Sequence, residues 1–171
     1  LMLATIVYFG EDGWLDWWRA MRANDLIISA GWEEAYYTRF SQYGGDAWLV
    51  NSYGTSPPAE VIFAVEPLDE APTGNVIIPN ASYLQIEGVG ILRNSDNVAL
   101  AEKFIDFMLS QRFQEDIPLN MFVYPVRRGA ALPSEFLDFA DIPETAAEID
   151  SVFVADNFEG WLDQWTDAVL R

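Results

Sequence analysis

The sequence contains no cysteine and no histidine. The absence of cysteine excludes disulfides and thiolate nucleophiles, and without histidine the chain lacks the commonest general base and the usual zinc ligands. Basic residues are also scarce, with 9 Lys and Arg against 27 Asp and Glu and a formal net charge of −18. Because a chain of this charge repels phosphate backbones, we expect no nucleic-acid partner.

Long hydrophobic runs are missing as well. A membrane-spanning helix needs roughly 18 or more consecutive apolar residues, and the longest clean run is much shorter, from Leu1 to Phe9. This end shows neither an initiator Met nor a basic segment typical of a signal peptide, so we expect the chain to be part of a longer polypeptide. The hydrophobic fraction of 51% and the aromatic fraction of 15% argue against disorder. A length of 171 residues suits one domain or one lobe of a larger protein.

Hydrophobic periodicity predicts alternating helices and short extended runs. Apolar residues at helical spacing predict helices over 12–24, 32–43, 96–109, 110–117 and 158–170, with a further helix starting at Pro57. Short β-prone runs predict extended segments over 26–29, 47–52, 76–79, 83–92 and 121–126. This alternation predicts an α/β architecture with a mixed sheet flanked by helices, in which ligands bind at strand ends and helix N-termini.

The segment 51–60 has the strongest pattern for a ligand site. It carries Tyr53, Thr55 and Ser56 from a predicted strand into a helix that begins at Pro57, with Ser56 as the expected N-cap. An aromatic ring and two hydroxyls beside free backbone N–H groups would bind a small polar or anionic ligand. An ordinary capped loop between a strand and a helix is the alternative.

Aromatic side chains at two other places are further candidates. Trp32 follows a glycine at the start of a predicted helix, where its ring can stack on a flat or cationic ligand. Tyr36 and Tyr37 offer phenol oxygens suited to ferric ion, but consecutive helical residues point about 100° apart. Phe122 and Tyr124 share one face of the predicted extended run 121–126, and core packing is the alternative for both.

The acidic residues and the tryptophan-rich helix allow less specific interpretations. Pairs such as Glu115 and Asp116 are more typical of a solvated surface than of a catalytic dyad, because the sequence fixes no carboxyl separation. Trp14, Trp17 and Trp18 are expected to pack in the core, and a partner-binding surface is the alternative.

Several short strings resemble one family, the thiamine-binding branch of the substrate-binding proteins of ABC importers. They occur in the order and spacing of that family over nearly the whole chain. The strings are Gly31-Trp32, Glu34-Ala35-Tyr36, Ser52-Tyr53, Thr55-Ser56-Pro57, Tyr83-Leu84-Gln85, Glu87, Lys103-Phe104, Phe107-Met108, Tyr124-Pro125-Val126, Trp161, Trp165, Ala168-Val169 and Arg171.

This resemblance implies a type II periplasmic-binding fold, in which two α/β lobes close on a ligand. The chain resembles the C-terminal half of such a protein, and the N-terminal lobe would supply the other wall of the cleft. Residues 1–126 would form most of the second lobe, with a hinge-crossing strand near 83–92, and residues 127–171 would return toward the first lobe as a helical segment. The resemblance further implies a periplasmic or cell-surface location and a membrane permease as partner.

The resemblance also implies which residues contact the ligand. Trp32 and Tyr53 correspond to aromatic contacts to the thiamine rings, and Phe122 stands where the family has a Trp. Aromatic faces suit the permanently cationic thiazolium ring. Thr55 and Ser56 would hydrogen-bond a ligand tail or a phosphate, which extends the candidates to thiamine phosphates. The family's second Tyr falls here on Ala59, which removes one stacking wall.

The resemblance implies a binding protein that uses no cofactor and no metal. A ferric-ion binder or another small-ligand binder of the same fold is the alternative, although iron-binding relatives place two consecutive Tyr where this chain has Ser52 and Tyr53. Thiamine-degrading enzymes share the fold but use a cysteine nucleophile, which is absent here. A carboxylate-driven hydrolase is the remaining enzyme alternative.

Overall fold

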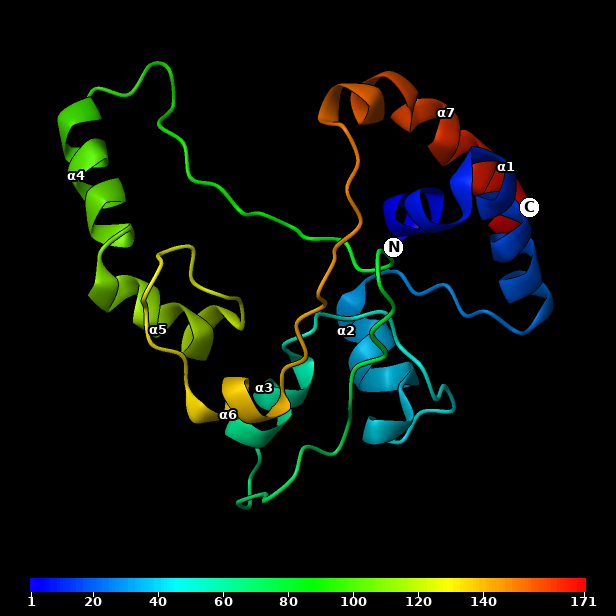
Figure 1. Cartoon of the computed structure of the whole chain (residues 1–171), viewed down its shortest axis with the longest axis horizontal. Helices are drawn as coiled ribbons and strands as arrows, with labels where there is room; N and C mark the ends of the chain where they lie inside the picture. Colours follow the sequence, from blue (N-terminus) through cyan, green and yellow to red (C-terminus); the bar gives the residue numbers. More distant parts are fainter. The chain divides into compact units, whose positions relative to one another are not determined.

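The computed structural model describes all 171 residues and divides into two compact units (Figure 1). The first unit comprises Leu1–Ser52, Val76–Gln85 and Ile142–Arg171. The second comprises Tyr53–Asn75 and Ile86–Asp141. None of the helices combines the length and the apolar character needed to span a bilayer.

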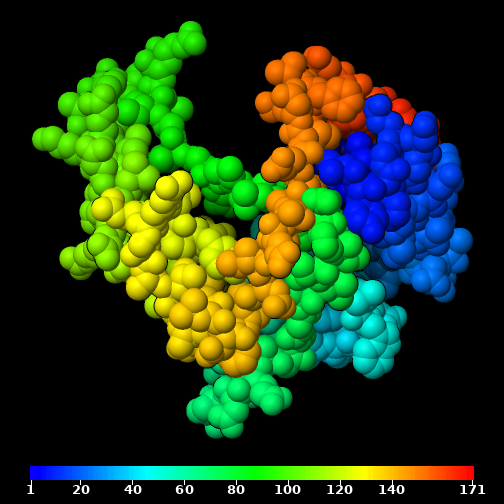
Figure 2. Space-filling model, viewed as in Figure 1, coloured from blue at the N-terminus to red at the C-terminus, as the bar shows by residue number.

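The first unit is built around the longest helices, α1 (Met2–Ala23) and α7 (Ser151–Val169), which pack side by side (Figure 1). Its shorter elements are α2 (Trp32–Glu34), the π-helix η1 (Ala35–Arg39) and the 3-10 helix η2 (Ser41–Tyr43). In Figure 2 the red C-terminal residues lie behind the blue N-terminal ones, as this pairing requires. The predicted helix 12–24 is confirmed but begins earlier, at Met2, with a non-helical bend at Gly10.

Large indole rings fill the core between α1 and α7. Trp14, Trp18 and Trp161 are buried there, which confirms the predicted packing of the first two. The Trp18 Nε1 donates to the Thr5 hydroxyl at 3.0 Å, so burial leaves this indole N–H satisfied. At the start of α7 the Asp150 carboxylate accepts hydrogen bonds from two backbone N–H groups, which caps the helix.

The second unit contains α3 (Ser56–Ile62), α4 (Val98–Met108), α5 (Gln111–Met121) and α6 (Ser134–Phe139). Helix α3 packs against α6, and α4 contacts α5 (Figure 1). The predicted helices 96–109 and 110–117 are confirmed as α4 and α5, although α5 continues to Met121 through Pro118.

The predicted mixed sheet is not present in this structure. The β-pairing consists of two isolated parallel bridges, Phe40 with Ala47 and Tyr83 with Ala147. The runs expected to be strands, including 83–92, pass through the structure without forming a ladder. A run of β-prone residues becomes a strand only where a second run lies alongside to accept and donate its hydrogen bonds. Apolar side chains of these runs, such as those of Val76 and Ile86, are consequently exposed.

Candidate functional site

Trp32 opens helix α2 in the first unit, and two contacts fix its indole ring. The indole Nε1 donates to the hydroxyl of Ser52 at 2.9 Å. The ring also stacks on Tyr36, with centroids 4.9 Å apart and planes 20° from parallel. The Trp32 side chain nevertheless remains 39% exposed. Trp32 is therefore an oriented aromatic residue that is accessible enough to stack on a ligand.

Tyr36 is the centre of an aromatic cluster that we define as Trp32, Tyr36, Tyr37, Phe40 and Tyr43. The Tyr36 ring lies within 5.6 Å of each of the other four, measured between centroids, and the residue is only 3% exposed. Tyr37 is half-exposed and stands edge-on to Trp32. Tyr36 and Tyr37 therefore differ in exposure, although their rings lie 5.4 Å apart and both contact Trp32 and Tyr43.

The backbone around this cluster departs from a regular α-helix. Residues 35–39 form a π-turn, closed by the hydrogen bond from the Phe40 N–H to the Ala35 carbonyl at 3.1 Å. Before the turn, the Ala30 N–H donates to the Glu34 carboxylate at 3.1 Å. Single-turn π-helices occur often at functional sites. The predicted single helix over 32–43 is therefore divided into three short elements.

The segment that carries Tyr53, Thr55 and Ser56 lies in the second unit. The Ser56 N–H donates to the Tyr53 carbonyl at 3.0 Å, and the Asn75 side-chain amide donates to the Gly54 carbonyl at 2.8 Å. These bonds hold the turn that leads into α3 and leave the Tyr53 side chain 52% exposed. The helix begins at Ser56, one residue earlier than predicted, with Thr55 at the N-cap position.

Thr55 does not cap α3 with its side chain. Its hydroxyl instead donates to the backbone carbonyl of Phe122, which lies 67 residues later in the chain. Thr55 is only 4% exposed, and the bond is partly buried. The structure thus brings together two predicted site positions that the sequence could not connect.

Phe122 is not part of an extended run, which corrects the prediction for 121–126. It terminates α5 in the left-handed region, with φ 55° and ψ 33°. This conformation is uncommon for a bulky residue and points the chain back toward α3. The Phe122 ring packs edge-on against Phe63, with centroids 5.0 Å apart. Phe122 and Tyr124 therefore do not share one face of a strand.

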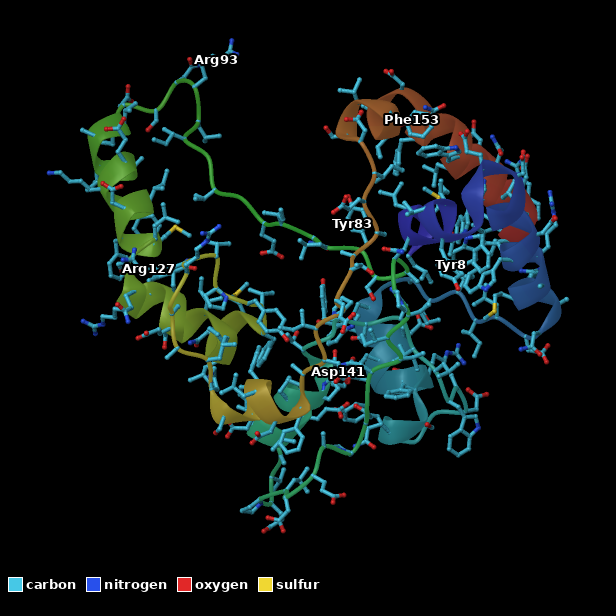
Figure 3. All side chains as sticks on the ribbon, viewed as in Figure 1. Tyr8, Tyr83, Arg93, Arg127, Asp141 and Phe153 are labelled. Carbon is cyan, nitrogen blue, oxygen red and sulfur yellow. The ribbon has the colours of Figure 1, made fainter.

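The Tyr124 phenol and the Asp141 carboxylate interact within the second unit, and Asp141 is labelled in Figure 3. A Cβ added at Gly54 would lie 3.4 Å from the backbone carbonyl oxygen of Asp141, so Asp141 lies against the turn at Gly54. Burial and the nearby Asp141 carboxylate raise the pKa of the Tyr124 phenol above its usual value. The Tyr124 hydroxyl is buried and has no hydrogen-bond partner.

Gln114 holds the segment after Phe122 in place, a role that the sequence analysis did not find. Its side-chain oxygen accepts from the backbone N–H groups of Val126 at 2.8 Å and Arg127 at 3.3 Å. Its side-chain nitrogen donates to the Met108 carbonyl at 2.8 Å. The Arg127 guanidinium, labelled in Figure 3, donates to the Leu109 carbonyl at 3.0 Å. Gln114 therefore ties this segment to the junction between α4 and α5.

The predicted site residues fall into two groups. Tyr53, Thr55, Ser56 and Phe122 belong to the second unit, where the Thr55–Phe122 bond joins them. Trp32 belongs to the first unit, where it binds Ser52, the residue that precedes Tyr53 in sequence. A cavity of about 400 Å³ lies between α1 and α7 and is lined by residues that include Glu11, Trp14 and Asp156, none of them a predicted site residue.

Comparison with known proteins identifies the family. The model of the family described as bacterial extracellular solute-binding protein matches residues 1–147. The chain belongs to this family. Membership confirms the resemblance to substrate-binding proteins.

Individual relatives agree with this assignment. The chain is 35% identical over 154 residues to the thiamine-binding periplasmic protein of Salmonella typhimurium, across 90% of this chain and 44% of that protein. It is 32% identical to the protein of the same name from Escherichia coli, across 100% of this chain and 49% of that protein. Iron uptake protein A1 of Synechocystis is 25% identical over 158 residues, across 89% and 43% of the two chains. The chain thus spans about half the length of the relatives it matches. No solved structure gives a significant match.

Proposed function

We propose that the full-length protein is the extracytoplasmic substrate-binding component of an ABC importer and that it binds thiamine or a thiamine phosphate. The observation that carries this proposal is the 35% identity to a thiamine-binding periplasmic protein over 90% of the chain. The proposed location is the periplasm or the cell surface, and the proposed partner is a membrane permease. The protein would carry its ligand without the help of a cofactor.

The proposed ligand-binding residues are Trp32, Tyr53, Thr55, Ser56 and Phe122. Trp32 and Tyr53 present accessible aromatic rings, which attract a cation such as the thiazolium through their negatively polarised faces. The net charge of −18 favours a cationic ligand over an anionic one at long range. The Thr55 hydroxyl already donates to Phe122 and the residue is buried, so Thr55 would contribute to the site by holding the turn.

Phosphate recognition has less support than recognition of the rings. Helix α3 begins Ser56-Pro57-Pro58, and the two prolines have no N–H to offer to an anion. Ser56 remains as a hydroxyl donor at this position. We therefore propose thiamine as the preferred ligand and its phosphates as ligands of weaker affinity.

The proposed arrangement of the full-length protein is a two-lobed, type II periplasmic-binding fold. Residues 1–126 would supply most of one lobe, the run 83–92 would cross between the lobes as a strand of a mixed sheet, and residues 127–171 would return toward the other lobe. The exposed apolar side chains of 76–92 support this proposal, because pairing into a sheet beneath helices would bury them. Enclosure between two lobes would also exclude water from the ligand.

Ferric ion is the second candidate ligand, and the similarity to an iron uptake protein favours it. Phenol oxygens would have to supply the ligands, and Tyr36 and Tyr37 are adjacent in sequence. The Tyr36 ring, however, is buried beneath Trp32, whereas Tyr37 is half-exposed. This difference supports thiamine over iron at the aromatic cluster.

Titration calorimetry of the full-length protein tests the proposal. The ligands are thiamine, thiamine monophosphate, thiamine diphosphate and ferric citrate, each added to ligand-free protein. Saturable heat with thiamine and recovery of unchanged thiamine from the complex would support a thiamine-binding protein. If only ferric citrate gives heat, the proposed ligand is iron and not thiamine. Conversion of thiamine during the titration would indicate an enzyme.

A further inference from the structure

Ser52 and Tyr36, from different segments, hold the edge and one face of the Trp32 indole, and Tyr37 adds an edge-on contact at 5.4 Å. A tryptophan side chain rotates about two bonds, and an accessible indole samples several rotamers unless neighbouring groups restrict it. Here the Nε1 atom is held by Ser52 at 2.9 Å, and one ring face is covered by Tyr36 at 4.9 Å. One contact fixes the edge of the indole and the other fixes its plane.

The sequence spacing explains why Tyr36 can perform this role. Residues four apart lie one above the other on a helix, so α2 and η1 place Tyr36 directly beneath Trp32. Tyr36 is itself held on other sides by Phe40 and Tyr43, with centroid distances of 5.6 Å to each. A ring that is 3% exposed and enclosed by aromatic neighbours forms a rigid base for the indole.

Ser52 supplies a constraint that a stacked ring alone does not. Two parallel rings can still rotate against each other, because stacking is tolerant of in-plane rotation. The hydrogen bond from the indole Nε1 to the Ser52 hydroxyl removes this freedom and joins residues 20 apart in sequence. It also holds the indole against the residue that immediately precedes Tyr53.

We propose that Tyr36 and Ser52 are positioning residues that set the indole plane of Trp32 before the ligand binds. This inference rests on the proposed function, because it assigns to Trp32 a stacking contact with the ligand's cationic ring. Holding an aromatic anchor in its bound orientation raises affinity by removing the entropy cost of ordering it on binding. Neither Tyr36 nor Ser52 needs to contact the ligand for this effect.

The first experiment measures the indole without ligand, in the ¹⁵N–¹H spectrum of the full-length protein. The Trp32 Nε1–H signal is assigned by its loss in Trp32→Phe. Ser52→Ala is expected to move this signal upfield because the hydrogen bond is lost, and Ser52→Thr is expected to restore it. Tyr36→Leu is expected to shift the same signal through loss of the stacked ring. A Trp32 signal that is unchanged in both Ser52→Ala and Tyr36→Leu would overturn the inference.

The second experiment measures thiamine affinity by calorimetry. Ser52→Ala and Tyr36→Leu are each expected to weaken binding about five- to tenfold, whereas Ser52→Thr and Tyr36→Phe retain affinity within about twofold. Tyr8→Leu is the control, because Tyr8 (labelled in Figure 3) is a half-exposed residue of α1 in the same unit, and its ring contacts Phe9. It is expected to leave thiamine affinity unchanged.

A double-mutant cycle separates positioning from general destabilisation. In a Trp32→Ala background, Ser52→Ala and Tyr36→Leu are expected to have no further effect on thiamine affinity, since both act through the indole. Equal losses with and without Trp32 would overturn the inference while leaving the proposed function intact. Absence of thiamine binding by the unmodified protein would refute the proposed function and, with it, the positioning role.

Discussion

The hydroxyl of Thr55 donates a hydrogen bond to the backbone carbonyl of Phe122, and both residues belong to the second unit. Phe122 occupies the left-handed region, which costs roughly 1–2 kcal/mol for a residue with a side chain. The bond from Thr55 and the packing of Phe63 against the Phe122 ring offset part of this cost. The turn that carries Tyr53 and the end of α5 therefore depend on each other.

Replacement of Thr55 by valine is expected to destabilise the protein, because it keeps the side-chain volume but removes the donor. The partly buried Phe122 carbonyl would lose its partner, at a cost of about 1–3 kcal/mol. Thr55→Ser keeps the hydroxyl and is expected to cost less. Urea unfolding of the three proteins measures the difference. Equal stability of the valine variant and the unmodified protein would show that this bond contributes nothing.

Replacement of Trp32 by alanine is expected to weaken thiamine binding by at least tenfold, or about 1.4 kcal/mol. The reason is the loss of an oriented aromatic face from the proposed site. The matched control is Trp48→Ala, which removes an indole that is almost fully exposed in the same unit. Calorimetry of the full-length variants provides the measurement. Unchanged affinity after loss of Trp32 would remove this residue from the site.

The Glu115 carboxyl is expected to titrate below its ordinary pKa of 4.5. Hydrogen bonds from the Gln111 side chain and from the Ala131 N–H favour its charged form and lower the pKa. A lowered pKa in the folded state gives stability that is present above the unfolded pKa and is lost as the pH falls through the folded pKa. Gln111→Ala is expected to move the Glu115 pKa back toward 4.5. NMR titration of the Glu115 side chain measures this pKa, and an unchanged value would show that Gln111 is not the cause.

Helix positions and part of the core follow directly from the sequence. The spacing of Trp14 and Trp18 predicts a buried face on one helix, and both are buried between α1 and α7. Trp32 and Tyr36 also lie at helical spacing, four residues apart, although the sequence singles out Tyr36 only together with Tyr37 and does not predict that it stacks on Trp32. Local periodicity predicts helices and their buried faces because each depends on residues within one or two helical turns.

Features that depend on distant partners could not be predicted in this way. The runs 83–92 and 121–126 have β-prone residues, but a strand needs a neighbour that the local pattern does not specify. Phe122 adopts a left-handed conformation that glycine or asparagine would indicate and phenylalanine does not. The bond from Thr55 to Phe122 joins positions 67 residues apart, and neither local sequence predicts it.

Removal of the buried Tyr124 hydroxyl is expected to have the opposite effect on stability to removal of the Thr55 hydroxyl. The Tyr124 hydroxyl has no hydrogen-bond partner, and the ring packs edge-on against the buried Phe136. Removing an unsatisfied polar atom removes its desolvation cost, so Tyr124→Phe is expected to leave stability unchanged within about 0.5 kcal/mol or to raise it. Urea unfolding at neutral pH compares the two proteins, and a loss of more than about 1 kcal/mol would show that the hydroxyl has a partner.

The same hydroxyl predicts how stability changes at high pH. Burial, and then the Asp141 carboxylate, raise the pKa of Tyr124 above its usual value of 10.0. A raised pKa means that the folded state favours the neutral phenol, so the unfolded state ionises first as the pH increases. Tyr124 therefore contributes stability that is fully present below pH 10 and is lost as the pH rises through the folded pKa. Tyr124→Phe is expected to flatten this part of the stability profile, and Asp141→Asn to lower the Tyr124 pKa in an ultraviolet titration. If the alkaline loss of stability is the same in Tyr124→Phe as in the unmodified protein, another group causes it.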